Sequence, residues 1–336
     1  MQPNRESIDS IWENNPDLIR KYLDLLPRHE KLCEEVQYIL ESKLSDAKIE
    51  IAHATSRAKT LQSYCEKIGR KSYSNPLKEI TDLAGVRVVF LYLSDLEKIE
   101  KTIEDEFEVI EKENKLKNND TEKFGYGALH YLVKIKQLHS GARYDDLRDL
   151  ICEIQVKTIL QDAWSIVAHH LSYKNENDVP KSLIRKLNAL SGLFETADDQ
   201  FESLRTARNQ YIEDAEKEIS KNNPKYFEQR INLDNLIAYI ASKFPERRKC
   251  DAEEYSNLLH ELISSGYNTL SELDESINKG LELALKEEVE DPPLNGESEP
   301  VGYLDIGIIR TALAISNEEY CVYKYGTNST MYLNYH

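Results

Sequence analysis

The alternation of hydrophobic and polar positions predicts a mostly helical start to the chain. Apolar side chains recur at helical spacing over residues 16–46, as in an amphipathic helix. Pro27 suits the first turn of a helix, so we expect two helices that meet near it. A short strand is expected at 48–54, followed by a helix from residue 55 or 56 to residue 70 that begins at a hydroxyl side chain.

The pattern then changes to that of a sheet. Residues 82–92 are rich in β-branched side chains, which indicates a buried central strand. Residues 128–136 and 150–157 alternate, with apolar side chains on one face and a polar set on the other. Between these strands we expect a helix at 94–105, a short strand at 107–111 and a polar loop at 112–122.

Helical periodicity returns after this sheet, at 159–171 and at about 180–221. Residues 1–221 are therefore expected to form an α+β domain with a mixed β-sheet of about five strands flanked by helices. The core stripe of the last helix is expected to contain Leu183, Leu187, Leu190, Phe194, Ala197, Phe201 and Leu204.

The composition shifts after the Asn-Asn-Pro segment at 222–224, where we place a domain boundary. Residues 222–336 are expected to form a smaller, mainly helical domain of unknown role. Residues 289–300 have the composition of a linker. The segment after it is expected to fold back as a helix at 304–316 and a strand at 319–324.

The charge narrows the classes of partner. The 336-residue chain has a formal charge of −17, which argues against non-specific binding to DNA or to anionic membranes. The last 115 residues hold −10 of this excess, with 20 acidic and 10 basic side chains. No long apolar run or signal pattern occurs, and five scattered cysteines indicate reduced thiols. A soluble cytoplasmic protein is expected.

Basic side chains cluster near the predicted helix that ends at residue 70. Lys59, Ser63 and Lys67 are spaced to share one helix face, and Arg57 lies at the expected helix start. Free N–H groups and the helix dipole favour an anion there. The cluster suits a polyphosphate, although a solvated amphipathic face would have the same pattern.

Two acidic residues occupy strands of the same predicted sheet. Asp82 lies at the entry to the central strand and Glu153 lies on another strand. Together they could hold Mg²⁺, which prefers oxygen ligands, and one of them could accept a proton from a nucleophilic hydroxyl. Taken singly, a carboxylate at such a position is more often a cap or an ion-pair partner.

Two further segments bring in polar and aromatic groups. Tyr126 lies between two glycines and could stack on a purine; closing a hairpin is the alternative role. His130 follows on the next strand. Gln155 and Lys157 share a strand face with Glu153, which is consistent with either a pocket or a solvated sheet surface.

Taken in order, these segments resemble the synthetase domain of the RelA/SpoT alarmone synthetases over roughly residues 15–210. The resemblance implies a nucleotidyltransferase-like fold and the transfer of pyrophosphate from ATP to the ribose 3′-hydroxyl of GDP or GTP. It also implies a role in guanosine tetraphosphate metabolism and the stringent response. The matching residues are Arg57, Lys59, Ser63, Lys67, Asp82, Arg87, Gly125, Tyr126, His130, Tyr131, Glu153 to Thr158, Gln161, Ala163, Trp164, His169, Leu171, Tyr173 and Lys174.

The resemblance also implies a role for each candidate residue. Asp82 and Glu153 would bind Mg²⁺ and act in catalysis, with Glu153 activating the hydroxyl. Lys157 stands where an arginine is usual, so its charge remains while bidentate geometry is lost. The ATP phosphates would be held by Arg57, Lys59, Ser63, Lys67 and Arg87, and the acceptor nucleotide by Lys123, Tyr126, His130, Gln155 and Lys157.

Other functions stay open at this point. One is a toxic synthetase, of a toxin–antitoxin or phage-defence type, that modifies the 3′ end of tRNA or an adenine nucleotide. Another is a nucleotide-binding regulator with an inactive site, against which the retained Asp82 and Glu153 argue. The absence of a His-Asp pair indicates a short form without a hydrolase domain. The acidic extension 222–336 could mediate self-inhibition, antitoxin binding or homo-oligomer formation.

Overall fold

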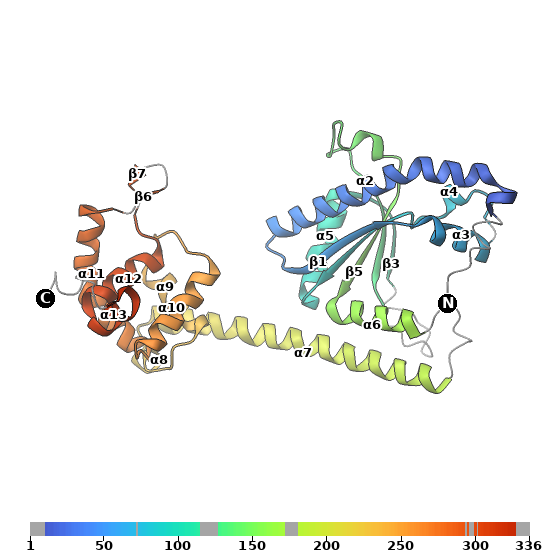
Figure 1. Ribbon diagram of the computed structural model, residues 1–336. Helices are drawn as coiled ribbons and strands as arrows, with labels where there is room; N and C mark the ends of the chain where they lie inside the picture. The colour runs from blue at the N-terminus through green and yellow to red at the C-terminus, as the bar shows by residue number, and fades with distance from the viewer. Residues whose placement is uncertain are drawn as a thin grey trace. The chain divides into compact units, whose positions relative to one another are not determined.

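The computed structural model describes residues 11–71, 73–114, 127–171, 181–292, 294–295, 299–300 and 302–326. The chain divides into two compact units, Met1–Arg205 and Thr206–His336, here called unit 1 and unit 2 (Figure 1). This division falls before the boundary expected after residue 221. It lies within the continuous helix α7 (Lys181–Ser220), because Ile219 near the end of that helix belongs to the hydrophobic core of unit 2.

Unit 1 is built on a mixed sheet of five strands, as the sequence predicted. The strand order is β1-β2-β5-β4-β3. Strands β2 and β5 run parallel and the other neighbouring pairs are antiparallel. The strands are β1 (Ile51–Ala58), β2 (Ala84–Phe90), β3 (Phe107–Asn114), β4 (Leu129–Ile135) and β5 (Cys152–Thr158).

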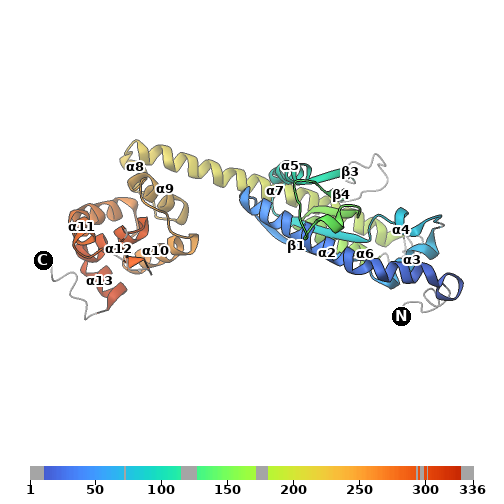
Figure 2. The ribbon, with the colours of Figure 1, turned by 90° about the horizontal axis from the view of Figure 1, so that it is seen from above.

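One face of this sheet is apolar and is covered by helices. Figures 1 and 2 show α2 running along the sheet beside β1, with α5 on the same core. Leu32 and Val36 of α2 and Ile103 of α5 are completely buried against the strands. The helices of unit 1 before α7 are α2 (Pro16–Asp46), α3 (Leu61–Arg70), α4 (Pro76–Glu79), α5 (Leu96–Glu106) and α6 (Ile159–Leu171).

The alternation of the strands leaves the opposite face polar. Tyr131 and Ile154 are fully buried on the apolar face, whereas their strand neighbours His130, Glu153 and Gln155 are half-buried on the other. The positions of β2, β4 and β5 and this division of faces agree with the prediction, whereas β3 continues to Asn114, into the segment expected as a loop at 112–122. The polar set of β2, β4 and β5 is therefore gathered on one surface.

Two predictions for the N-terminal helices were wrong. Pro27 lies inside a single helix, α2, instead of separating two. Buried side chains on both sides of the proline, such as Tyr22 and Leu32, anchor both halves of the helix. The strand β1 also continues to Ala58, because its backbone pairs with β2 as far as Ala84, so the next helix starts only at α3.

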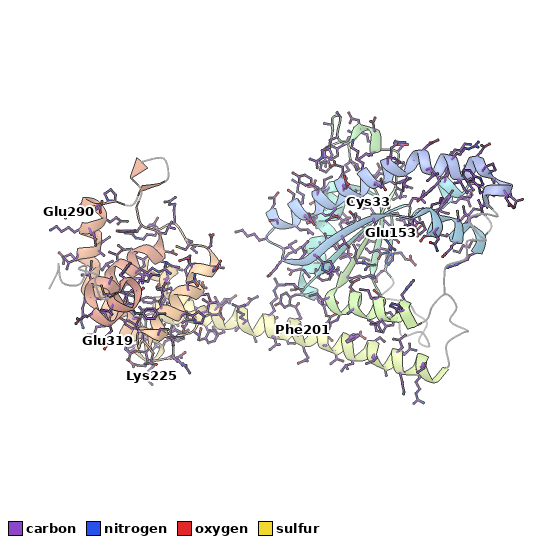
Figure 3. The ribbon with its side chains drawn as sticks, viewed as in Figure 1. Cys33, Glu153, Phe201, Lys225, Glu290 and Glu319 are labelled. Carbon is purple, nitrogen blue, oxygen red and sulfur yellow. The ribbon has the colours of Figure 1, made fainter. Side chains whose placement is uncertain are left out.

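The expected core stripe of α7 was also wrong in part. The face of α7 that packs against the rest of unit 1 is polar: Ser191 and Asp198 are only 4% exposed. Glu202 accepts a hydrogen bond from the Ser94 backbone N–H, and Arg205 contacts Asp95 at 2.5 Å. This docking face lies about 100° around the helix from the apolar stripe. The stripe's most exposed members are Leu183, Leu190, Phe201 (labelled in Figure 3) and Leu204.

Unit 2 is mainly helical, as expected, and has its own core. Two of its helices, α11 and α12, pack so closely that a Cβ on Gly280 would lie 2.0 Å from the Ala312 carbonyl oxygen. The expected helix at 304–316 is confirmed by α12. Its remaining elements are α8 (Pro224–Phe227), α9 (Leu233–Lys243), α10 (Ala252–Ser264), α11 (Leu270–Glu290), β6 (Leu294–Asn295), β7 (Glu299–Pro300), α12 (Asp305–Ser316) and α13 (Glu318–Tyr325).

The strand expected at 319–324 was wrong, because these residues form α13. The Asn317 side chain accepts a hydrogen bond from the Tyr320 N–H and so caps the helix. Tyr320 and Cys321 are then buried in the core of unit 2. Within the described part of the chain, no helix is long and apolar enough to cross a membrane.

Candidate active site

A cavity of about 320 Å³ opens on the polar side of the sheet in unit 1. Residues from the ends of β1, β2 and β5 and from the start of α3 line it, and Figure 3 labels Glu153 at this sheet. The lining charges are three cations and two carboxylates, so the cavity is positive within a strongly acidic chain. The lining is Thr55, Ser56, Arg57, Ala58, Lys59, Thr60, Ser63, Asp82, Gly85, Val86, Arg87, Glu153 and Gln155.

Two lysines hold the carboxylate of Asp82. Lys59 Nζ lies 2.7 Å from Oδ2 and Lys67 Nζ lies 2.8 Å from Oδ1. Burial alone would raise the pKa of Asp82, but the hydrogen bonds and charges of the two lysines outweigh it and hold the pKa below its usual range. Asp82 is therefore ionised at neutral pH and leaves a net positive charge on this group of three.

The second carboxylate, Glu153, is held by two side chains of neighbouring sheet positions. His130 Nδ1 lies 2.8 Å from Oε1, and Gln155 Nε2 donates to Oε2 at 2.9 Å. Burial and the nearby charge of Asp82 act to raise the pKa of Glu153, yet the His130 and Gln155 contacts bring it below its usual range. Glu153 is thus ionised and fixed in orientation beside the cavity.

A third group lies where α6 begins. Arg87 Nη1 of β2 lies 3.0 Å from Asp162 Oδ1, and Lys157 Nζ of β5 lies 3.9 Å from the same oxygen. Lys157 Nζ also donates to Ser165 Oγ at 2.9 Å. Arg87 lines the cavity, whereas Asp162 is not among its lining residues.

The structure brings together most of the residues that the sequence singled out. Seven of them line the cavity, and three more bind a lining or neighbouring residue: Lys67 binds Asp82, His130 binds Glu153, and Lys157 approaches Asp162. Lys123 and Tyr126 lie outside the described residues. The lining members are Arg57, Lys59, Ser63, Asp82, Arg87, Glu153 and Gln155.

The expected polyphosphate helix needs a correction. Arg57 lies on β1 and Lys59 lies between β1 and α3, so only Ser63 and Lys67 are helical. The helix is instead capped by Thr60, whose side chain accepts a hydrogen bond from the Ser63 N–H. The cations converge because the strand end, the turn and the helix border one cavity, and not because of i, i+4 spacing.

Sequence reasoning missed two features of the site. The hydroxyls of Thr55, Ser56 and Thr60 line the cavity, yet no spacing set them apart from other hydroxyls on the chain. Asp162 was passed over although it lies in the first turn of the helix after the Glu153 strand. The sequence offered only the closeness of Asp162 to Lys157 along the chain. That signal is weak, because the nearer partner of Asp162 is Arg87, which lies on a distant segment of the chain.

The donor atoms at the cavity suit a hard divalent cation. Asp82 and Glu153 both line the cavity with ionised carboxylates, and the charge of Asp82 acts on the pKa of Glu153. Among the described residues no group of three or more His, Cys, Asp or Glu side chains could hold a metal by itself. Mg²⁺ fits such a pair, because it binds through one or two carboxylates and takes its other ligands from water and substrate phosphates.

Comparison with known proteins places a family region over this site. Residues 56–178 match the family described as a region found in RelA/SpoT proteins. This range runs from the end of β1 to α6 and contains every described candidate residue of the cavity. The RelA/SpoT resemblance predicted from the motifs is thus confirmed for this segment.

The individual proteins that the chain resembles share about a quarter of its residues or fewer over the aligned segments. The chain is 27% identical over 157 residues to GTP pyrophosphokinase YwaC of Bacillus subtilis, covering 45% of this chain and 71% of that protein. It is 26% identical over 161 residues to GTP pyrophosphokinase YjbM of the same organism, covering 46% and 72%. The crystal structure of small alarmone synthetase 1 from Bacillus subtilis has 20% identity and a TM-score of 0.49, covering 56% of this chain and 98% of that one.

Proposed function

We propose that unit 1 transfers pyrophosphate from ATP to the ribose 3′-hydroxyl of GDP or GTP, giving AMP and a guanosine nucleotide of the (p)ppGpp class. The observation that carries this proposal is the cavity, where three cations and two ionised carboxylates meet on one sheet face. The RelA/SpoT region at 56–178 and the two relatives named GTP pyrophosphokinase support it at the level of the family.

The cations of the cavity would bind the ATP phosphates. Arg57, Lys59, Arg87 and Ser63 line the cavity, and Lys67 contacts the lining residue Asp82. Guanidinium and ammonium groups make charge-assisted hydrogen bonds to phosphate oxygens. The phosphates would draw the two lysines from Asp82, so ATP binding would free that carboxylate.

Asp82 and Glu153 would hold Mg²⁺, whose charge, when bound, offsets that of the transferred phosphates. Asp82 would become available for this role when its lysines turn to the phosphates. Glu153 would remain oriented throughout by His130 and Gln155. The pair keeps its negative charge at neutral pH because both pKa values lie below their usual ranges.

Glu153 would also be the base. Its carboxylate accepts the proton of the 3′-hydroxyl, the hydroxyl oxygen bonds to the β-phosphorus of ATP, and the bond from that phosphorus to the α–β bridging oxygen breaks to release AMP. The acceptor would be held by His130, Gln155 and Lys157. Lys123 and Tyr126 keep the acceptor roles that the sequence resemblance implies.

Incubating the purified chain with Mg²⁺, ATP carrying a γ-³²P label and one acceptor at a time tests the proposal. We expect the label at the 3′ position of GDP or GTP, together with stoichiometric AMP. Label at the ribose 3′ position of ATP or AMP, or on the 3′ end of tRNA, would instead indicate a synthetase of different acceptor class. Absence of transfer to every acceptor would overturn the enzymatic function.

A further inference from the structure

Asp162 touches both halves of the site without lining the cavity. Its Oδ1 atom faces Arg87 Nη1 at 3.0 Å and Lys157 Nζ at 3.9 Å. Arg87 belongs to the proposed ATP-binding set and Lys157 to the proposed acceptor-binding set. The two cations come from parallel neighbouring strands, where Val89 of β2 is the register partner of Lys157. One carboxylate oxygen therefore approaches one cation of each subsite.

The surroundings of Asp162 make this contact strong. The side chains of Asp162 and Lys157 are only 10% and 9% exposed, and that of Arg87 is 32% exposed. Water screens such charges much less than it screens a surface pair. Asp162 Oδ1 is buried and makes no hydrogen bond of good geometry within the described residues, so the two cations are its main stabilising neighbours.

The backbone around Asp162 is fixed independently of the substrates. Thr158 and Gln161 cap the start of α6 reciprocally, through N–H to side-chain bonds of 2.8 and 3.1 Å. Thr158 Oγ1 also donates to Asp198 Oδ2 of α7 at 2.7 Å. Asp162 follows directly in the first turn, so its carboxylate is carried by a rigid element while the two cations end long, flexible side chains.

We propose that Asp162 is a positioning residue that sets Arg87 of the ATP subsite and Lys157 of the acceptor subsite through one buried carboxylate oxygen. This inference rests on the proposed function, because it takes the two subsites from it. Lys157 also donates a hydrogen bond to Ser165, whereas Arg87 forms its ion pair, within the described residues, with Asp162. Loss of Asp162 should therefore weaken ATP binding more than acceptor binding, and loss of Ser165 should affect the acceptor alone.

Equilibrium binding of a non-hydrolysable ATP analogue and of GDP, measured separately by calorimetry on the full chain, tests this inference. For Asp162→Asn we expect the Kd for the analogue to rise by about tenfold and the Kd for GDP by a smaller factor. For Ser165→Ala we expect only the Kd for GDP to rise. Asp199→Asn, an exposed change on α7, is the control and should change neither.

Double-mutant cycles separate positioning from a general structural effect. In an Arg87→Ala background, Asp162→Asn should no longer weaken binding of the analogue, and in a Lys157→Ala background it should no longer weaken binding of GDP. If the variant does not fold, Asp162→Glu, which keeps the charge but moves the carboxylate, should show the same pattern at smaller size. Additive effects, or a change in one ligand alone, would overturn the inference. Failure of the unaltered chain to bind either nucleotide would overturn the proposed function as well.

Discussion

Two carboxylates, one in each unit, are held by basic side chains, but they differ in what surrounds them. In unit 1, Asp82 is shared by Lys59 and Lys67 at a cavity whose lining carries more positive than negative charge. In unit 2, Glu261 is bound by Arg310 and Lys324. Tyr320 also donates to it, and Glu254 forms a second ion pair with Arg310, so that the cluster holds two cations and two carboxylates.

This difference in surroundings indicates whether an ion cluster takes part in a reaction or stabilises the fold. The Asp82 cluster keeps a net positive charge that can bind a phosphate group. Its lysines can therefore change partner from Asp82 to a bound ligand. The Glu261 cluster is neutral and its central carboxylate is saturated with donors, so a ligand would gain little by breaking it. We therefore expect changes in the first cluster to affect transfer and changes in the second to affect folding.

Among the changes that test this comparison of clusters, the largest effect is expected from Asp82→Asn, which keeps the shape of the side chain and removes its charge. Transfer should fall by about 100-fold or more, because one metal-binding carboxylate is lost. Asp274→Asn is the matched control, since Asp274 is also held by a lysine, Lys243 at 2.5 Å, but in unit 2. Steady-state rates measure both, and equal losses in the two variants would break the distinction between the clusters.

Glu261→Gln should affect stability instead of transfer. Lys324 would then be partly buried without its paired carboxylate and Arg310 would keep only Glu254, at a cost of about 3 kcal/mol to the free energy of unfolding. Glu275→Gln removes an exposed pair with Lys279 and should cost less than about 1 kcal/mol. Urea denaturation measures both, and transfer at low temperature should be unchanged. A loss of transfer by the folded Glu261 variant would contradict this assignment.

Gly280→Ala tests the packing on which unit 2 depends. The added methyl group would collide with the Ala312 carbonyl, so the two helices must separate at a cost of about 1–3 kcal/mol. In α7, Gly192→Ala meets no atom within 4 Å and should stabilise its helix by about 0.5–1 kcal/mol. The Tm of thermal unfolding should fall for the Gly280 variant and rise for the Gly192 variant. Tm shifts in the same direction would contradict the claim that the contact between α11 and α12 limits stability.

The smallest effect is expected from His130→Ala, read from the pH dependence of kcat/KM. The contact from His130 helps to lower the pKa of Glu153, so the acid limb of the profile should move to higher pH in the variant. The stability contributed by Glu153, present above its unfolded pKa and lost as the pH falls through the lowered value, should shrink too. His170→Ala, an exposed change on α6, is the control and should leave the acid limb of the profile in place. An acid limb that does not move in the His130 variant would contradict the proposed role of His130.

Much of unit 1 could be predicted from sequence because its signals are local. The two alternating strands fix which side chains face the core, so the alternation alone placed Glu153, Gln155 and His130 on one surface. The order of motifs then indicated the RelA/SpoT region at 56–178.

What could not be predicted depends on contacts between distant residues. Pairing of β1 with β2 keeps Arg57 extended where propensity favoured a helix. The packing of α7 through Ser191 and Asp198 leaves part of its apolar stripe exposed, although such a stripe usually faces inward. The contact of Arg87 with Asp162 joins a strand to a helix far along the chain and has no local signal.

The central claim is that Glu153 accepts the proton of the attacking hydroxyl in the cavity. The most direct test is a single-turnover reaction of Glu153→Gln with labelled ATP and GDP, beside calorimetric binding of a non-hydrolysable ATP analogue. We expect 3′-labelled product to be lost while the analogue still binds through Arg57, Lys59 and Arg87. Product formation at the rate of the unaltered chain would contradict the claim.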